Sequence, residues 1–214
     1  MDITFIKARD LNEAWWKCIR EVLTKGYEYT IDSGSYAGQK RKEFDFVVVH
    51  IEHPGTRPLV PTVPEGVPPP TDIEYVERDY LPYLMSNLKQ ANETYTYGED
   101  IEQQFLRIVE MYKKGFNTNQ ATMTVGNRDS IYLSDPPCLR IIDTRVRYGK
   151  LHFVVYFRSW DLYAGFPNNL AGIQLMKEFM AGEIGVEDGE IIAVSKGLHL
   201  YEHNWEVARL VAGL

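Results

Sequence analysis

The sequence predicts a mixed α+β fold, and three observations point to it. Segments with helical spacing of apolar residues alternate along the chain with short runs typical of β-strands. The length of 214 residues fits one compact domain, residues 1–214. Hydrophobic residues make up 44% of the chain and charged residues 25%, close to the globular average, which excludes extensive disorder and fibrous repeats.

The first predicted element is a helix over residues 10–26. Asp10 is a suitable N-cap, apolar residues then recur at helical spacing, and Gly26 is a suitable stop. Cys18 lies on the apolar face of this helix, so we interpret it as a buried hydrophobic residue and not as a nucleophile. Residues 44–51 are rich in Val and Phe and predict a strand.

A proline-rich loop is expected next. Seven of the eleven prolines of the chain lie between residues 53 and 71, where they exclude regular structure. Residues 73–88 follow with a helical pattern that Pro82 interrupts. A more regular helical pattern at 101–112 ends at Gly115.

From residue 121 onwards the pattern becomes mostly β. Strand patterns cover 121–125, 139–147 and 151–157, and a turn at Tyr148-Gly149 joins the last two into a hairpin. The rest of the chain is predicted to form a helix, a strand and a helix, at 168–185, 190–194 and 201–211.

Charge and composition exclude several classes of function. The formal net charge of −7 and the pI near 5.3 disfavour nucleic acid as a partner. Two cysteines, Cys18 and Cys138, are too few for a zinc-binding cysteine cluster, and we expect no metal. No apolar run is long enough to cross a membrane, and the first residues do not resemble a signal peptide, so we expect a cytoplasmic protein.

The predicted hairpin brings a cysteine close to an arginine. If Arg147 pairs with Lys150, Cys138 lies opposite Ser159, one residue from Arg158, and a bulge would shift this register by one residue. A neighbouring guanidinium favours the thiolate, which is the nucleophilic form of cysteine. The alternative is a structural cysteine beside a surface arginine.

Residues 158–172 carry polar side chains between a strand and an apolar helix, which predicts a pocket lining. Arg158 and Ser159 can bind a phosphate, and the amide of Asn169 offers a donor and an acceptor to the edge of a planar ring. The alternative is structural, with Asn168 or Asn169 as the N-cap of the helix after a turn.

Four motifs occur in a characteristic order: Tyr97-Gly98, Asp135-Pro136-Pro137-Cys138, Arg158 to Asn169, and Gly197 to Tyr201. With these motifs the sequence resembles the thymidylate synthase family, and most of all its short archaeal members. The resemblance implies a thymidylate synthase-like fold, in which a mostly antiparallel or mixed β-sheet packs with helices. It also implies a homodimer in which two sheets pack back to back.

The resemblance also implies roles in covalent chemistry on a pyrimidine nucleotide. Cys138 would be the nucleophile that adds to C6 of the base. Arg158 and Ser159 would hold the phosphate, and Arg158 would keep the thiolate charged. Asn169 would bind the pyrimidine edge, and Tyr97 would help to remove the C5 proton.

Further residues would bind the ribose and the one-carbon carrier, again by resemblance. His199 and Tyr201 would bond the ribose hydroxyl. Asp161 would orient the pterin, and Gly165 would let its ring approach. An acidic residue normally polarises the base through ordered water, and two candidates are Glu74 and Glu77.

The sequence departs from the family pattern at several places. Asn119-Gln120 stands where bacterial-type members carry an arginine pair that reaches the neighbouring subunit's phosphate site. We expect Arg41, within Lys40-Arg41-Lys42 after the loop at 34–38, to supply the missing charge. Trp160 stands where many members have cysteine. The sequence ends at Leu214 without the long tail that closes over the folate, so we expect closure to differ.

The sequence favours a thymidylate synthase that methylates dUMP to dTMP. The one-carbon donor would be 5,10-methylene-tetrahydrofolate or methylene-tetrahydromethanopterin, and the sequence does not decide between them. Alternatives are a pyrimidine nucleotide hydroxymethylase acting on dCMP, CMP or dUMP, a non-catalytic nucleotide-binding protein, and a cysteine hydrolase using Cys138 with His199 or His203. Asn169 argues for uracil, because a cytosine site prefers an aspartate that accepts from the exocyclic amine.

Overall fold

A computed structural model describes residues 1–34, 36–91 and 93–214. The strands are β1 (Ile3–Ala8), β2 (Tyr27–Thr30), β3 (Lys40–Glu43), β4 (Phe46–Ile51), β5 (Thr122–Thr124), β6 (Leu139–Arg147), β7 (Lys150–Phe157), β8 (Trp160–Asp161), β9 (Glu187–Ser195) and β10 (Leu198–Tyr201). The α-helices are α1 (Leu11–Lys25), α2 (Ile73–Tyr75), α3 (Leu81–Met85), α4 (Gly98–Lys114), α5 (Gly165–Ile184) and α6 (Trp205–Ala212). A π-helical turn covers Val76–Tyr80, and 3-10 turns cover Arg128–Tyr132 and Glu202–Asn204.

The strands form two mixed sheets, which confirms the predicted α+β class. The larger sheet has the order β1-β4-β9-β7-β6-β5, with parallel pairing of β1 with β4 and of β7 with β9, and antiparallel pairing elsewhere. The smaller sheet has the order β2-β3-β10-β8. Because β7 and β9 are parallel neighbours, the chain between them must cross over the sheet, and it does so through α5.

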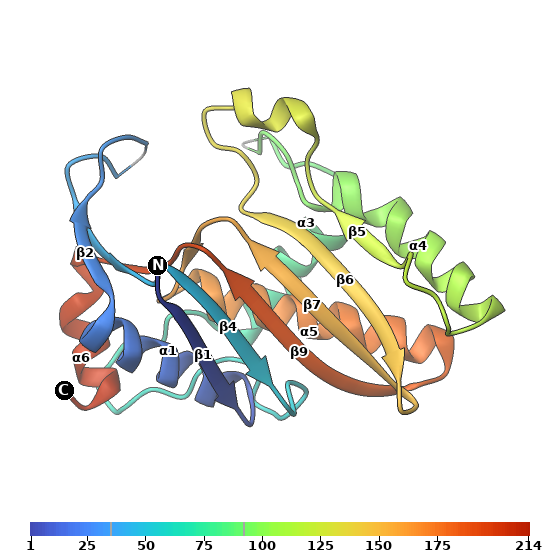
Figure 1. Ribbon diagram of the computed structural model, residues 1–214, viewed down its shortest axis with the longest axis horizontal. Helices are drawn as coiled ribbons and strands as arrows, with labels where there is room; N and C mark the ends of the chain where they lie inside the picture. The colour runs from blue at the N-terminus through green and yellow to red at the C-terminus, as the bar shows by residue number, and fades with distance from the viewer. Residues whose placement is uncertain (35, 92) are drawn as a thin grey trace.

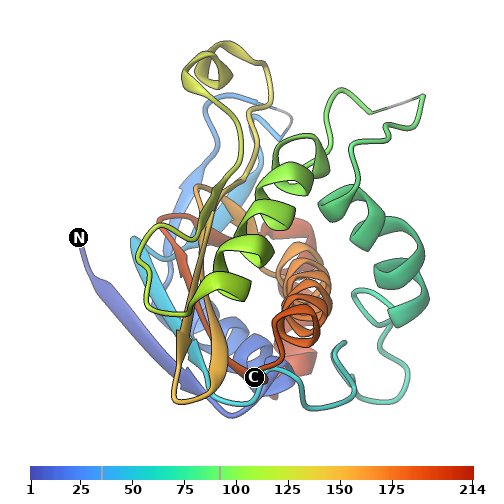
Figure 2. The ribbon, with the colours of Figure 1, turned by 90° about the vertical axis from the view of Figure 1, so that its right-hand side faces the viewer.

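Helices cover only one face of the larger sheet (Figure 1 and Figure 2). Helix α5 contacts β7 and β9 on one side and α3 and α4 on others, so it lies in the middle of the molecule. Twelve of its twenty residues are buried, which explains its nearly continuous apolar sequence. This central position makes the start of α5 a rigid support for the side chains near residue 165.

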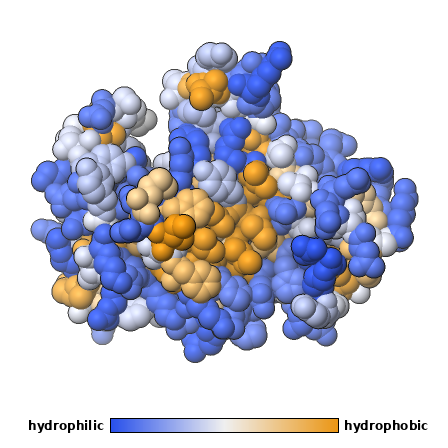
Figure 3. All heavy atoms as spheres, in the orientation of Figure 1, coloured by the Kyte–Doolittle hydropathy of each residue, from blue (hydrophilic) through white to orange (hydrophobic). Residues whose placement is uncertain are grey.

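The opposite face of the larger sheet is apolar and uncovered (Figure 3). Its side chains come from alternate positions of five strands: Ile3, Phe5, Phe46, Val48, Ile141, Val154, Tyr156, Ile192 and Val194. Strand register aligns five of them in one row, in the order Phe5, Val48, Val194, Tyr156 and Ile141. We call this set the open sheet face.

Several predicted elements are confirmed near their expected limits. Asp10 caps α1 by accepting a hydrogen bond from the backbone N–H of Glu13, and Cys18 is fully buried on that helix. The proline-rich segment 53–71 contains no helix or strand. Both strands of the hairpin at 139–157 are present, with Arg147 paired to Lys150 as predicted.

Three expectations about element limits were wrong. The predicted helix at 201–211 begins only at Trp205, because Tyr201 ends β10. Helix α5 begins at Gly165 and not at Asn168, so neither Asn168 nor Asn169 is its N-cap. Pro82 does not end the helical path from 73, because it lies in the first turn of α3, where a missing N–H is tolerated.

The structure also adds strands that the sequence patterns did not predict, β1, β2, β3, β8 and β10. Among the described residues, no helix has the length and apolar character needed to span a lipid bilayer.

Candidate active site

The hairpin of β6 and β7 brings Cys138 and Arg158 together. A bulge between Leu139 and Ile141 shifts the register by one residue at the end of the hairpin. As a result, the backbone N–H of Arg158 donates to the carbonyl of Cys138 at 2.9 Å. Cys138 therefore lies opposite Arg158, and the register expected without a bulge, which paired it with Ser159, was wrong by one residue.

The side chain of Arg158 folds back over the segment that precedes the cysteine. Its Nε donates to the carbonyl of Pro137 at 3.1 Å, and a terminal nitrogen donates to the carbonyl of Pro136. The same guanidinium lies 3.5 Å from the carboxylate of Asp135. These contacts hold a positive charge beside the entrance to Cys138.

Cys138 is half-buried, and its electrostatics combine opposing effects. Burial raises the pKa of its thiol, the positive charge of Arg158 lowers that pKa, and the carboxylate of Asp135 raises it. Burial and then the carboxylate of Glu21 raise the pKa of Cys18 strongly, and no cation is among the causes of that shift. Cys138 is thus the cysteine whose thiolate a neighbouring charge favours.

Tyr97 also lies next to the cysteine. Its buried hydroxyl accepts a hydrogen bond of 3.4 Å from the backbone N–H of Leu139. Burial and then the nearby Cys138 raise the pKa of this phenol. The absence of a side chain at Gly98 makes this placement of Tyr97 possible, because a Cβ at residue 98 would lie 2.0 Å from the carbonyl oxygen of Ser86.

Asp161 organises the turn between β8 and α5. Its carboxylate accepts backbone N–H groups of Ala164 at 3.1 Å, Gly165 at 2.9 Å and Tyr163 at 3.2 Å. Asp161 is therefore the residue that caps the start of α5, a position in which an acidic side chain is favoured by the helix dipole. A Cβ at Gly165 would lie 3.3 Å from the Cβ of Asp161, so a larger residue would crowd this turn.

Asn169 lies in the second turn of α5. Its Oδ1 accepts a hydrogen bond of 2.8 Å from the indole Nε1 of Trp160. Ser159 is half-buried beside Gly197, since a Cβ on that glycine would lie 3.5 Å from the Cα of Ser159. The end of β7 and the start of α5 thus carry four of the predicted site residues: Arg158, Ser159, Asp161 and Asn169.

His199 is a buried, neutral hydrogen-bond acceptor. Its Nδ1 lies 2.8 Å from the carbonyl oxygen of Gly197, so this nitrogen carries the proton. Burial lowers the pKa of His199 from 6.5 to about 4. Its Nε2 is buried and has no hydrogen-bond partner among residues 1–34, 36–91 and 93–214. The carboxylate of Glu43, 3.9 Å away, consequently faces an uncharged ring.

Arg41 is placed beside this histidine by β-sheet pairing. Strand β3 pairs with β10 so that Arg41 is opposite Tyr201 and Glu43 is opposite His199. The Arg41 guanidinium bonds the hydroxyl of Tyr29 and lies 3.2 Å from Glu43. Tyr201 in turn packs edge-on against the His199 ring, with 4.6 Å between ring centroids.

The two lysines that flank Arg41 form ion pairs with a carboxylate of the same chain. Lys40 and Lys42 lie 3.1 Å and 3.6 Å from the carboxylate of Glu28. Ser35, part of the loop that precedes this segment, lies outside the described residues.

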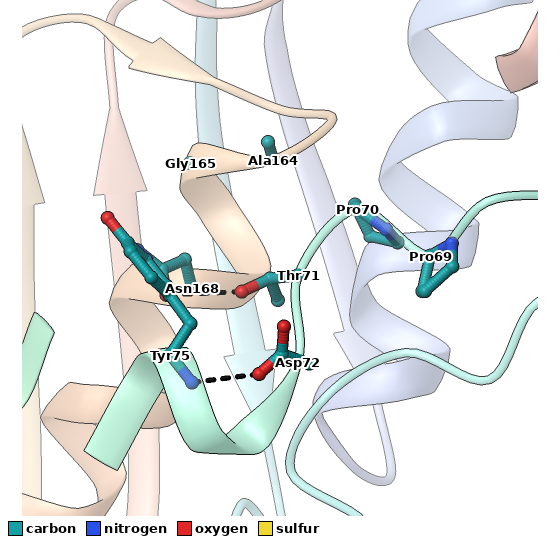
Figure 4. A pocket seen from close by; sticks show the side chains of 8 residues that line it. All are labelled: Pro69, Pro70, Thr71, Asp72, Tyr75, Ala164, Gly165 and Asn168. Atoms are coloured by element: carbon teal, nitrogen blue, oxygen red, sulfur yellow. Dashed lines mark hydrogen bonds between the residues drawn. The ribbon is translucent and has the colours of Figure 1, made fainter. Parts of the chain in front are cut away.

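Two clefts adjoin the start of α5. One has a volume of about 510 Å³ and contains both Asn169 and Tyr97 among its lining residues: Tyr75, Asp79, Tyr80, Tyr83, Gln90, Glu93, Tyr97, Asn168 and Asn169. The other, of about 520 Å³, runs along the end of the proline-rich loop (Figure 4) and is lined by Pro69, Pro70, Thr71, Asp72, Tyr75, Ala164, Gly165 and Asn168. Tyr75 and Asn168 line both, so the two clefts are neighbours.

A family model described as Thymidylate synthase matches residues 84–211. The chain belongs to the thymidylate synthase family. A protein from Methanosarcina acetivorans named "Putative thymidylate synthase" is 29% identical, over 98% of this chain and 95% of its own. One of the same name from Methanothermobacter marburgensis is 28% identical, over 96% of each chain. A thymidylate synthase from Listeria monocytogenes is 34% identical over 110 residues, 51% of this chain and 35% of its own.

Membership of the thymidylate synthase family implies a pyrimidine nucleotide substrate and a folate-type one-carbon cosubstrate. The structure brings Cys138, Arg158 and Tyr97 together at the end of the hairpin. In the part of the chain described, the hydrogen bonds of His199 and His203 go to Gly197 and Gln39, and none joins either ring to the Cys138 sulfur.

Sequence reasoning missed two residues that the structure places at this candidate site. Trp160 contacts Asn169, and the buried Tyr80 lines the same cleft. Trp160 could have been found because it stands where many family members have cysteine. No motif in the sequence indicates that Tyr80 lies at the site. Glu74 and Glu77 are exposed and do not line this cleft.

The carboxylates that do line the cleft are Asp79 and Glu93. Asp79 lies within the π-helical turn at Val76–Tyr80. Asn119 and Gln120 are exposed, and the Oδ1 of Asn119 accepts a hydrogen bond of 3.4 Å from Arg145.

Proposed function

We propose that residues 1–214 form one catalytic domain that converts dUMP to dTMP by reductive methylation, through a covalent bond between Cys138 and C6 of the base. The observation that carries this proposal is the meeting of three groups. Arg158 is opposite Cys138 across the bulged end of the hairpin, and the Tyr97 hydroxyl bonds the next residue, Leu139. A simple nucleotide-binding protein needs no such thiol.

The chemistry of uracil requires a nucleophile of this kind. C5 of a uracil ring attacks electrophiles poorly, but addition of a thiolate at C6 converts the ring to an enolate whose C5 is nucleophilic. Burial raises the pKa of Cys138, and the charge of Arg158 opposes that effect and so favours the thiolate. Once C5 has bonded to the donated one-carbon unit, the Tyr97 hydroxyl assists removal of the proton from C5. Loss of the carrier and transfer of its hydride to the one-carbon unit would leave a methyl group on C5, and expulsion of the thiolate restores the double bond between C5 and C6.

The nucleotide is held at its phosphate and its ribose. Arg158 and Ser159 bind the phosphate, and Arg41 adds charge once its contact with Glu43 is exchanged for the phosphate. Nε2 of His199 accepts a hydrogen bond from the ribose hydroxyl, which would satisfy the buried acceptor that has no protein partner. Tyr201, packed against that ring, provides a second polar contact.

The cleft of about 520 Å³ fits a flat, partly polar carrier. Prolines line one wall, and the backbone at Ala164 and Gly165 lines the other, where the absence of a side chain at Gly165 leaves space (Figure 4). When bound there, a methylene-carrying tetrahydrofolate or tetrahydromethanopterin supplies the one-carbon unit and the hydride. Asp161 orients its pterin ring with the lone pairs that the capping bonds leave free. The proposal requires no metal.

We propose a homodimer in which two open sheet faces pack back to back. Phe5 is 64% exposed and Ile3 74% exposed on this face, and an uncovered apolar surface of this kind is typical of interfaces. The row from Phe5 to Ile141 crosses five strands, which makes the contact continuous.

Product analysis tests the function. The protein is incubated with dUMP or dCMP and with the methylene form of tetrahydrofolate or tetrahydromethanopterin, and products are identified by mass. We expect dTMP from dUMP with one of the two carriers. A 5-hydroxymethyl nucleotide would identify a hydroxymethylase instead, and nucleotide binding without any product would favour the non-catalytic alternative.

A pair of cysteine variants supplies the control. Cys138→Ala should abolish turnover, whereas Cys18→Ala should retain it, because Cys18 is buried in α1. Turnover that survives in Cys138→Ala would refute the covalent mechanism.

A further inference from the structure

Trp160 is held rigidly at the base of the site. Its indole is 3% exposed and stacks on Phe157, with 3.9 Å between ring centroids and 9° between planes. Phe166 packs on it at 4.7 Å between centroids, and the Trp160 backbone N–H donates to the carbonyl of Gly197 at 2.8 Å. Backbone and ring are both fixed, so the direction of the indole N–H is fixed as well.

This N–H determines which way the Asn169 amide points. An indole nitrogen can only donate, and of the two ends of an amide only the oxygen can accept. The contact of 2.8 Å from Nε1 to Oδ1 therefore assigns the oxygen to the Trp160 side and the NH₂ group to the other side. The oxygen retains a second lone pair for another donor.

The part of the Asn169 amide that does not face Trp160 is exposed to a cleft, and Tyr80 lines this cleft as well. Asn169 and Tyr80 line the same cleft of about 510 Å³. Tyr80 is 6% exposed, and its hydroxyl has no hydrogen-bond partner among the described residues. The cleft thus contains both the Asn169 amide and an unpartnered buried hydroxyl.

We infer that Trp160 is a positioning residue that sets the choice of base, an inference that rests on the proposed function. With its NH₂ group held away from Trp160, Asn169 donates to a 4-oxo group, and its second oxygen lone pair accepts from N3–H of uracil. Cytosine presents an amino group and an unprotonated N3 at these positions, so donor would face donor and acceptor would face acceptor. Trp160 thereby selects 4-oxo over 4-amino pyrimidine nucleotides.

The test compares the affinities of dUMP and dCMP by calorimetry in wild type and in Trp160→Phe. Phenylalanine keeps a stacking ring and removes the N–H donor together with part of the ring volume, so the amide becomes free to rotate. We expect the ratio of dUMP to dCMP affinity to fall about tenfold, the worth of one neutral hydrogen bond. If Trp160 had a purely structural role, the substitution would weaken the binding of both nucleotides by the same factor. An unchanged ratio of the two affinities would therefore overturn the inference.

Trp15→Phe is the matched control. Its indole is also buried, and it donates to the carbonyls of Leu162 and Tyr163 at 3.0 Å in the same segment, but not to Asn169. We expect this variant to keep the wild-type ratio. In an Asn169→Asp background there is no amide to orient, so adding Trp160→Phe should leave the ratio unchanged.

A measurement on the wild-type protein covers the case in which Trp160→Phe does not fold. In nitrogen-15 spectra, the side-chain NH₂ signals of Asn169 should shift on binding dUMP, while the Trp160 indole signal stays in place. A shift of the Trp160 indole signal on binding dUMP would mean that its hydrogen bond to Asn169 is broken in the complex, and this would overturn the inference. If the wild-type protein turns over dUMP but fails this test, only the inference about Trp160 is overturned and the proposed function stands. If the wild-type protein binds neither nucleotide, the inference and the proposed function are both overturned.

Discussion

Replacement of His199 by asparagine should reduce the acid sensitivity of folding. Burial lowers the pKa of His199 from 6.5 to about 4, so between these values the unfolded chain binds a proton that the folded chain does not. The stability of the wild type therefore falls as the pH falls through this window and is unaffected by this group above it. With these two pKa values, the loss at pH 4.5 is about 2.5 kcal/mol.

Asparagine suits this test because its side-chain NH₂ can replace the imidazole Nδ1–H that donates to Gly197. The free energy of unfolding is measured in urea at pH 7 and pH 4.5, and the change between the two is compared in wild type and His199→Asn. The variant should lose about 2.5 kcal/mol less than wild type. His203→Asn, at an exposed histidine, controls for the loss of a histidine elsewhere. Equal losses in wild type and His199→Asn would refute the assignment of a buried neutral imidazole.

Three more expectations concern the proposed chemistry and assembly. Arg158→Gln should slow alkylation of Cys138 by iodoacetamide at pH 8, because the charge that lowers the thiol pKa is gone. The same variant should bind dUMP about tenfold more weakly, or weaker still. Unchanged alkylation would contradict the role of that charge. Tyr97→Phe should slow tritium release from C5 of dUMP about a hundredfold with little change in dUMP affinity, and a loss confined to affinity would argue against a role in proton removal. Val194→Asp, in the middle of the open sheet face, should shift sedimentation towards a monomer, whereas an unaltered sedimentation coefficient would exclude this face as the dimer contact.

The site could be located from the sequence because its strongest signals are local. The hairpin from 139 to 157 has a clear turn and alternating residues, so its pairing of Arg147 with Lys150 was predicted. That pairing alone brought Cys138 to within one residue of its observed partner, Arg158. The bulge after Leu139 could not be predicted, since an extra residue in one strand leaves no local signal in this sequence.

Asp161 illustrates how one residue can carry a second role. Sequence reasoning assigned it to the pterin and assigned helix capping to Asn168 or Asn169 as the alternative. In the structure, three backbone N–H groups at the start of α5 bond the Asp161 carboxylate. A cap that precedes the helix by several residues is hard to recognise, because the intervening turn has no helical pattern.

The sequence by itself determined the α+β class, the limits of the hairpin and of α1, and the neighbourhood of Cys138 and Arg158. These follow from periodicity, capping residues and motifs, which act over a few neighbouring residues. Only the tertiary structure decided that the amide of Asn169 faces Trp160, that Nε2 of His199 is an unpartnered acceptor, and that Asp79 lines the cleft. Such features depend on contacts between strands and helices from distant parts of the chain, and no local pattern encodes the orientation of a side chain across such a contact.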